Sequence, residues 1–258
     1  MRFINDIKKY RKYIIYSAKT QLKSEVNNAY FDWLWWVLEP FGLMLVYAVV
    51  FGTVLGASEK YFTIFIFSGN AIWGFFSKSL IASVRMIKNN EITISKVYLP
   101  KMILVLNEMM VNTYKMMINF AIVFVMLLLY RVPISWRIVY IIPILAILYI
   151  FVYACCVIVM HIGVFIADAT YVINIGLNMM MYISGLFYSF DRFAEPVRSI
   201  LQNCNPIAFL ITEMRKVVMY CQEPNYVGLV LWMLISLLLA AVGTNLVYKN
   251  ENNYVKVI

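Results

Sequence analysis

The sequence contains few of the residues that bind metals or carry acid–base chemistry. It has one histidine, His161, among 258 residues, and its four cysteines are Cys155, Cys156, Cys204 and Cys221. A single histidine cannot build a multi-histidine metal site, and these cysteines lack the spacing of a metal-binding motif. The sequence therefore predicts no metal ion and no cofactor bound by this chain.

The motifs of several enzyme classes are also missing. The chain has no G-x-x-x-x-G-K-[ST] loop, so it cannot bind nucleotide phosphates in the usual P-loop manner. It has no G-x-S-x-G motif and no closely spaced acidic pair in a loop, which a metal-dependent glycosyltransferase would need. We therefore predict no catalytic residue, and no enzymatic activity is expected of the chain by itself.

Charged residues are scarce, at 14% of the chain, whereas 63% of the residues are hydrophobic and the mean hydropathy is +0.78. A soluble domain of this size would leave much of that apolar surface in water. A bilayer accepts the apolar surface, provided that backbone polar groups are satisfied within helices. The apolar runs are long and do not alternate as barrel strands do, so the sequence predicts an all-α integral membrane protein.

Six apolar runs have about the 20 residues that a membrane span requires. The predicted transmembrane helices cover residues 33–55, 61–84, 102–130, 138–160, 171–190 and 226–248. They form one transmembrane domain, residues 31–258, preceded by a separate region, residues 1–30. In that region, apolar side chains recur every three or four residues from Arg2 to Val26 beside many lysines, which predicts an amphipathic interface helix. A solvated basic arm is the alternative.

The segment between the fifth and sixth spans, residues 191–225, mixes three prolines with apolar runs. It is too short for a folded outer domain. Asparagine is a good helix cap and proline a good first helical residue, so we predict two short re-entrant helices with a break at Asn205–Pro206. Cys204 and Cys221 lie in this segment and are candidates for a disulfide; the alternative is that both are small packed residues.

The net charge of +9 indicates the orientation of the chain in the membrane rather than nucleic-acid binding. Most lysines and arginines fall in the N-terminal region, in residues 85–101 and in the C-terminal tail, which lie on one side of the six spans. Basic residues gather on the cytoplasmic side of membrane proteins. Both termini are therefore predicted to be cytoplasmic. The polar stretch from Met1 to Asn28 does not resemble a cleaved secretory signal.

Some polar residues fall inside the predicted spans. Glu108, Lys115 and two asparagines, Asn112 and Asn119, recur on one helical face of the third span. Intramembrane charges usually face a bundle interior or a water-filled path, but Glu108 is also close enough to the span's start to lie at the interface, and Lys115 can snorkel. Glu39 precedes Pro40 in the first span, where a hinge or pore role and a structural role are both open.

Aromatic residues make up 16% of the chain, and many lie near span ends. Such residues often form an interface belt. Their flat faces also suit the C–H groups of sugar rings, which makes a substrate path the sharper hypothesis. The candidate path residues are Trp33, Trp36, Trp73, Phe76, Tyr182, Phe187 and Tyr188.

Several short motifs occur in a characteristic order along nearly the whole chain. They are Leu34-Trp35-Trp36-Val37-Leu38-Glu39-Pro40, Val50-Phe51-Gly52, Ser68-Gly69 with Trp73, Ile94-Ser95-Lys96-Val97-Tyr98-Leu99-Pro100, Ser184-Gly185-Leu186-Phe187-Tyr188, Asn205-Pro206-Ile207-Ala208 and Arg215. In this order the sequence resembles the permease subunits of ABC exporters of lipid-linked polysaccharide, such as O-antigen, capsule and wall teichoic acid exporters. It departs from their pattern at Ala167-Asp168, where the resemblance would place Arg-Asp.

The resemblance implies a homodimer of six-span subunits in a bacterial cytoplasmic membrane, paired with two separate ATP-binding cassette subunits that bind ATP and Mg. Residues 85–101 would then hold the helix that couples the permease to the ATPase. The expected coupling residues are Lys88, Asn89, Asn90, Glu91, Ile92, Lys96 and Tyr98.

The predicted substrate is a lipid-linked glycan or a polyol-phosphate polymer resembling teichoic acid. Two alternatives remain open at this stage. One is an ABC exporter of a small lipid-like or drug substrate, and the other is a membrane-embedded transferase acting on polyprenyl-linked sugars. The scarcity of acidic and histidine clusters argues against the transferase.

Overall fold

The computed structural model describes residues 2–26, 34–54, 59 and 61–257, and these ranges form helices joined by short connections, without a strand. The all-α prediction is confirmed for this part of the chain. The elements in chain order are α1 (Arg2–Val26), α2 (Trp35–Tyr47), the π-helix η2 (Ala48–Val54), α3 (Phe62–Val84), α4 (Met86–Asn89), α5 (Glu91–Lys96), α6 (Lys101–Leu129), the 3-10 helix η3 (Trp136–Tyr140), α7 (Ile141–Phe165), α8 (Ala169–Ile183), the 3-10 helix η4 (Phe190–Arg192), α9 (Val197–Cys204), α10 (Pro206–Val218) and α11 (Tyr226–Val257).

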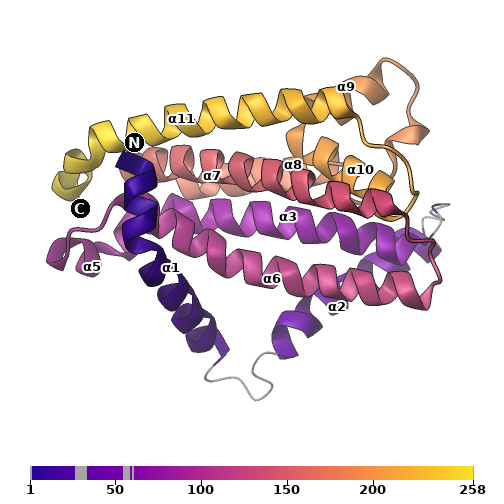
Figure 1. The fold of residues 1–258 in the computed structure, drawn as a ribbon, viewed down its shortest axis with the longest axis horizontal. Helices are drawn as coiled ribbons and strands as arrows, with labels where there is room; N and C mark the ends of the chain where they lie inside the picture. The colour runs from indigo at the N-terminus through magenta and orange to yellow at the C-terminus, as the bar shows by residue number, and fades with distance from the viewer. Residues whose placement is uncertain (1, 27–33, 55–58, 60, 258) are drawn as a thin grey trace.

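The long helices lie lengthwise beside one another, and both termini are at one end of the bundle, together with α4 and α5 (Figure 1). The segment with α9 and α10 is at the opposite end. Five helices of the described chain are long and apolar enough to cross a membrane: 35–52, 62–84, 101–129, 136–165 and 226–254. The fifth predicted span corresponds to α8, which has 15 residues and a length of about 22 Å, so the count of six spans stays a prediction.

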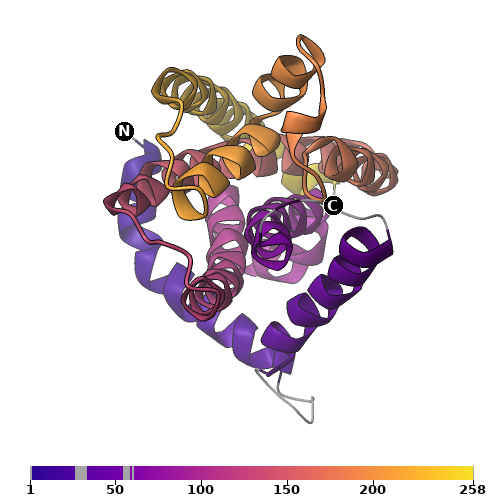
Figure 2. The same cartoon turned by 90° about the vertical axis from the view of Figure 1, so that its right-hand side faces the viewer.

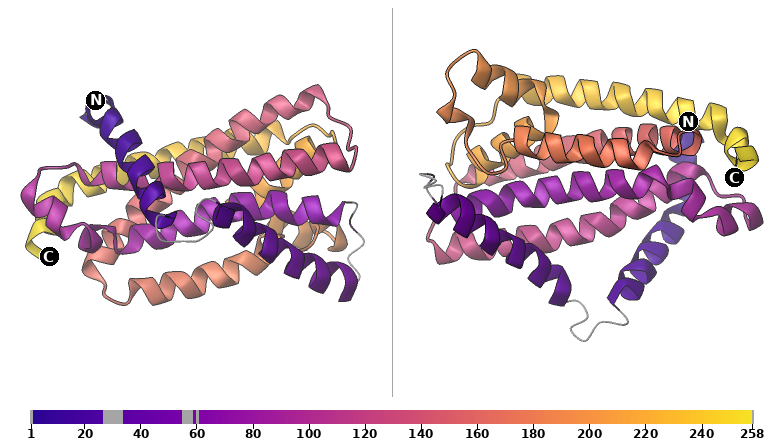
Figure 3. Two further views of the ribbon diagram at one scale, coloured as in Figure 1. Left: turned by 90° about the horizontal axis from the view of Figure 1, so that it is seen from below. Right: turned by 180° about the vertical axis from the view of Figure 1, so that it is seen from behind.

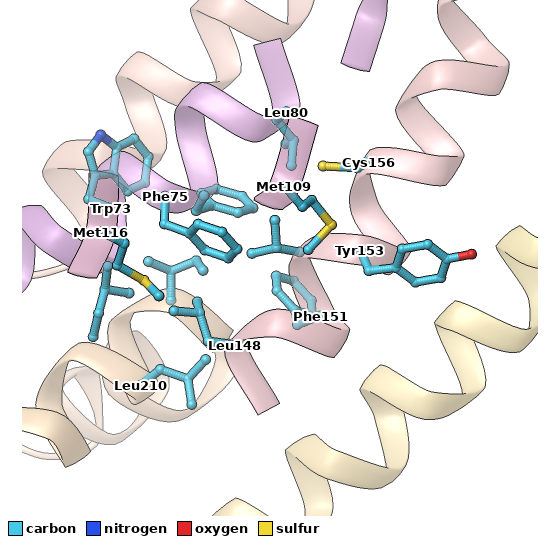
Figure 4. Packing of buried hydrophobic residues seen from close by; sticks show 14 of the residues in the cluster. Trp73, Phe75, Leu80, Met109, Met116, Leu148, Phe151, Tyr153, Cys156 and Leu210 are labelled. Carbon is cyan, nitrogen blue, oxygen red and sulfur yellow. The ribbon is translucent and has the colours of Figure 1, made fainter. Parts of the chain in front are cut away.

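Helix α3 lies at the centre of the bundle and packs against α6, α7 and α10 (Figure 2). Its side chains are buried on most faces, as expected of a helix that is apolar all round. The core joins Trp73 and Phe75 of α3 to Met109 of α6 and Phe151 of α7 (Figure 4). The ends of α3 and α7 are close, because a Cβ on Gly163 would lie 1.9 Å from the carbonyl oxygen of Val84.

Three predicted helix ends are wrong. The helix of the fourth span, α7, continues to Phe165 instead of ending at residue 160. The fifth span ends at Ile183 instead of residue 190, because Ser184 begins a turn in which Gly185 adopts a left-handed conformation with φ +66°. The sixth span continues beyond residue 248, since α11 reaches Val257. Its polar last turns make tertiary contacts, through Glu251 among others, and these contacts stabilise a helix that the polar composition did not predict.

Helices α1 and α2 lie on one side of the bundle (Figure 3). The predicted N-terminal helix is present over Arg2–Val26, with Ala18 and Leu22 packed on Val111 of α6. None of the described side chains in the apolar stretch from Trp35 to Gly52 is buried. Helix α2 therefore presents most of its surface outward.

The predicted break in the segment before α11 is confirmed. The Asn205 side chain accepts hydrogen bonds from the backbone N–H groups of Ile207 and Ala208 at 3.0 and 3.3 Å, and Pro206 is the first residue of α10. Helix α10 is largely buried, whereas α9 has no buried residue. Re-entry of these helices into the membrane stays a prediction.

The cysteines at this end do not form the disulfide considered above. Cys204 and Cys221 are both free thiols, and the Cys221 thiol donates to the carbonyl oxygen of Pro133 at 2.9 Å.

Candidate functional site

A polar cavity of about 200 Å³ lies between α2, α3 and α6. It brings together residues that were predicted separately, since Glu39 of the first span and Lys115 of the third both line it. The Lys78 ammonium lies 3.2 Å from the Glu39 carboxylate, and both side chains are more than half exposed in the single subunit, at 53% and 57%. An ion pair at this position in a span needs water or polar groups beside it.

The polar face of α6 is divided between two neighbours. Glu108 accepts from the Gln21 amide at 2.9 Å and Lys115 pairs with Glu25 at 2.7 Å, so α1 supplies both partners. Asn112 instead donates to Ser79 of α3 at 3.1 Å. The side-chain oxygen of Asn119 is buried and has no hydrogen-bond partner within the described part of the protein, and this side chain lines the cavity.

An aromatic cluster adjoins the polar cavity. The Phe187 ring stacks on Phe51 with centroids 4.5 Å apart and meets Tyr47 edge-on at 4.9 Å and Tyr182 at 6.0 Å. Tyr47 also lines the cavity, so the cavity and the cluster are continuous along α2. We refer to the two together as the α2 groove. It offers hydrogen-bonding groups at one end and flat apolar faces at the other.

The other predicted path residues lie in different surroundings. Trp73 and Phe76 are both buried in the core, but only Trp73 also lines the cavity, whereas the Phe76 ring lies 6.2 Å from Phe151. Trp36 packs against the contact between α1 and α6. Tyr188 is near Phe190 and donates its hydroxyl hydrogen to the carbonyl oxygen of Tyr182. Trp33 lies outside the described residues. The structure thus brings Trp73, Tyr182 and Phe187 to the α2 groove.

Sequence reasoning missed Tyr47 and Asn70 as candidates, although both line the cavity. Tyr47 and Phe51 are four residues apart, a spacing at which helical side chains share a face, and this was the available signal. Asn70 had no signal beyond its being polar inside a span.

Three of the motifs that carried the resemblance, those at Ser68–Gly69, Ser184–Tyr188 and Asn205–Ala208, assemble around one buried arginine. Arg215 of α10 is 4% exposed and donates to the carbonyl oxygens of Phe65, Gly185 and Leu186 at 2.7 to 3.2 Å. A Cβ on Gly69 would lie 2.6 Å from its guanidinium nitrogen. The Asn205 amide completes the contact by donating to Ser184 at 2.9 Å. Three distant motifs therefore form one structural unit, which holds α10 against α3 and the turn after α8.

The predicted coupling residues lie in and after α4 and α5, at the end of the bundle with both termini (Figure 1). We call residues 85–100 the α4–α5 segment. It is anchored by buried Met86, Ile87 and Ile94. Its exposed predicted residues are Lys88, Asn89, Glu91, Ile92, Lys96 and Tyr98, whereas Asn90 is half-buried and donates to the carbonyl oxygen of Met86.

A second cavity, of about 520 Å³, opens beside the α4–α5 segment. Arg85, Lys88 and Glu91 line one side, and Ala167 and Asp168 line the other. The position at which the sequence departs from the expected pattern is therefore next to this segment. The Arg85 guanidinium donates to the Thr170 hydroxyl at 3.0 Å across the opening.

Within the ranges that the structure describes, no three His, Cys, Asp or Glu side chains are grouped so that they could hold a metal ion. The candidate site is thus a polar and aromatic groove along spans, joined to an exposed helical segment at the termini. Long apolar helices with such a groove define a multi-pass helical membrane protein.

Comparison with known proteins narrows this class. The chain is 22% identical to an O-antigen export system permease protein RfbA of Klebsiella pneumoniae, over 95% of this chain and 94% of that protein. A second Klebsiella pneumoniae protein of that description is 24% identical over 80% of each chain, and one from Myxococcus xanthus is 23% identical over 84% of each. These relatives confirm the resemblance to polysaccharide-exporter permeases. No model of a known protein family matches the chain.

Proposed function

We propose that this chain is the transmembrane permease subunit of an ATP-driven ABC exporter that moves a lipid-linked polysaccharide or a teichoic-acid-like polymer across a bacterial cytoplasmic membrane. The observation that carries the proposal is the similarity to O-antigen export permeases along nearly the whole chain. The meeting of three of the motifs named above at Arg215 supports it, because these distant parts of the resemblance touch in space.

The exposed α4–α5 segment supports a separate ATPase partner. The chain has no P-loop, so an energy source must act on it from outside. Ile92 is 72% exposed and lies among charged neighbours, and an exposed apolar side chain at a polar surface suits a protein contact. We propose that the α4–α5 segment of each of two permease copies docks on one of two ATP-binding cassette subunits in the cytoplasm. Because both termini lie at the same end of the bundle as this segment, they are then cytoplasmic as well.

The exposed face of α2 supports a second copy of the chain as partner. Leu38, Phe41 and Leu45 are exposed on α2, and the side chains of the Glu39–Lys78 pair are more than half exposed as well. Lipid alone would be a poor environment for that ion pair. In a homodimer the α2 groove of each subunit would instead face a shared path for the polymer.

The direct test measures ATP hydrolysis and transport with defined components. The purified chain alone should hydrolyse no ATP, because it has no phosphate-binding loop. The complex with its genomic-neighbour ATPase, reconstituted in vesicles, should hydrolyse ATP and export a lipid-linked glycan. Turnover by the chain alone, from a preparation free of other ATPases, would contradict the permease assignment.

The aromatic part of the α2 groove leads to a second prediction. Combined alanine substitution of Tyr47, Trp73 and Tyr182 should slow export by about tenfold or more, since each ring contact is worth about 0.5–1.5 kcal/mol. Single substitutions should have smaller effects, because a row of weak sites tolerates one loss. The measurement is the export rate divided by the amount of membrane-inserted protein.

A matched control exists in the same chain. Trp136, Tyr140 and Tyr226 form an aromatic group of identical composition outside the groove, with ring centroids 5.5 to 5.9 Å apart. Their replacement should reduce abundance or stability and leave export per molecule unchanged. Equal normalised rates for the two triple variants would remove the case for an aromatic path.

A further inference from the structure

A cluster of polar side chains lies at the end of the bundle with both termini, and neither the α2 groove nor the exposed part of the α4–α5 segment accounts for it. The Arg2 guanidinium donates to Tyr98 at 2.7 Å and to the Glu251 carboxylate at 2.9 Å. The Tyr98 hydroxyl lies 3.3 Å from the same Glu251 oxygen. Tyr248, one turn earlier on α11, donates to Asp6 at 2.7 Å and lies under the Arg2 guanidinium.

Glu251 is the buried centre of this cluster. It is 7% exposed, and one carboxylate oxygen receives both Arg2 and Tyr98. The other oxygen is buried and has no hydrogen-bond partner in the part of the chain that the structure describes. Lys101, which is 3% exposed, adds a positive charge that interacts with Glu251. A carboxylate held in this way depends strongly on its partners, since a buried charge that loses one is left uncompensated.

The two hydrogen-bond partners of Glu251, Arg2 and Tyr98, keep their charge states near neutral pH. Burial lowers the pKa of Arg2, but the tyrosinate form of Tyr98, which exists only at high pH, and the Glu251 carboxylate outweigh this effect and raise the pKa above its ordinary value. Burial and the Glu251 charge also raise the pKa of Tyr98. Arg2 therefore stays protonated and Tyr98 neutral at physiological pH.

The cluster joins three segments that are distant in sequence: the start of α1, the exit of the α4–α5 segment and the last turns of α11. Tyr98 is 61% exposed, yet its hydroxyl reaches the buried carboxylate. Further along α11, the Tyr254 hydroxyl lies 2.7 Å from His161 of α7. These contacts connect the α4–α5 segment at Tyr98 directly to α1 and α11, and through α11 to α7.

We propose that Glu251 is a positioning residue that ties the α4–α5 segment to α1 and α11, so that a push on this segment from the cytoplasm moves the two terminal helices together. This link, formed by Arg2, Tyr98 and Glu251, needs no substrate or partner protein. Its consequence for transport rests on the proposed function.

The tie can be tested without substrate or ATPase, by hydrogen–deuterium exchange of the full chain in lipid nanodiscs. Tyr98→Phe removes the hydroxyl that accepts from Arg2 and donates to Glu251, and Glu251→Gln removes the negative charge that strengthens both contacts. Amides in the first turns of α1 and the last turns of α11 should therefore exchange about tenfold faster, and together. Glu223→Gln is the matched control, because Glu223 pairs with Arg137 at 3.3 Å outside the cluster. Faster exchange confined to the turn that carries the substitution would overturn the proposal.

The consequence is tested in vesicles with the complete complex. Polymer exported per ATP should fall about tenfold in both variants, the loss expected for one charge-assisted hydrogen bond. Glu251→Gln, which changes a buried residue outside the exposed α4–α5 segment, should keep kcat and KM of ATP hydrolysis near the wild-type values. Arg2→Lys, which keeps a cation beside Glu251, should retain coupling, whereas Arg2→Gln should not. Unchanged export per ATP in Tyr98→Phe and Glu251→Gln would rule out the positioning role. If wild-type complex exports no lipid-linked glycan, the proposed function fails, and the exchange experiment still decides the tie.

Discussion

Replacement of Arg215 by methionine is expected to destabilise the protein by about 3 kcal/mol or more, since it leaves three buried carbonyl groups without their donor. Methionine has a similar length but no donor. The carbonyl oxygens of Phe65, Gly185 and Leu186 would each lose a bond of 2.7 to 3.2 Å in a buried place. An unpaired buried carbonyl carries a penalty of about 1–3 kcal/mol. Helix α10 should therefore detach from α3 and from the turn after α8.

The measurement is thermal unfolding of the detergent-solubilised protein, combined with alkylation of Cys204 and Cys221 at a fixed temperature. A large fall in the melting temperature and faster thiol labelling are expected for Arg215→Met. Arg198→Met is the control from the same end, because the Arg198 side chain is 41% exposed and pairs with exposed Asp191. A surface pair of this kind contributes at most about 1 kcal/mol. Equal melting temperatures for the two variants would contradict the role assigned to Arg215.

The sequence predicted the apolar helices well because the bilayer imposes a simple rule, about 20 apolar residues in a helix. Helix α3 differs from its predicted range by one residue at the start, and α6 by one residue at each end. The α8 boundary failed for a different reason. The apolar run continues to Phe187 and Phe190, so hydropathy gave no sign that Gly185 turns the chain and that Arg215 takes up the freed carbonyl groups.

The candidate site was only partly predictable. Glu39, Lys115 and Trp73 were each singled out as polar or aromatic residues in spans, and all three line one cavity. Their proximity depends on how α2, α3 and α6 pack, which periodicity alone does not determine. The Glu39–Lys78 pair in particular joins two helices whose relative register cannot be read from either sequence.

The contacts of Arg215 and Glu251 show a second limit. Arg215 is bound by backbone carbonyl groups, and every residue except proline offers the same pair of backbone groups, so its partners leave no trace in the sequence. Glu251 lies in a polar stretch that resembled a disordered tail. Its partner Arg2 is at the other end of the chain, and only the fold brings the two together.

Proline at Ser95 is expected to abolish coupled export while the protein remains in the membrane. Ser95 is an exposed interior residue of α5, so its replacement removes no buried packing. A proline ring at this position clashes with the carbonyl group of Glu91 and removes a helix hydrogen bond, at a cost of about 3 kcal/mol or more. A helix of six residues has too few other hydrogen bonds to offset that loss. Helix α5 should therefore unwind, and the ATPase would no longer meet the helical surface that we propose it binds.

The experiment compares three variants by ATP hydrolysis of the assembled complex and by export per membrane-inserted protein. Ser95→Ala removes only the hydroxyl, which donates to the carbonyl of Ile92 at 3.1 Å, and should behave as wild type. Glu91→Pro places the same ring at the first residue of α5, a position that tolerates proline, and should keep most of the coupling. Normal export by Ser95→Pro would show that α5 is not the coupling helix. Equal loss in Glu91→Pro and Ser95→Pro would show that the helical form of α5 is not what the partner recognises, because only Ser95→Pro is expected to unwind it.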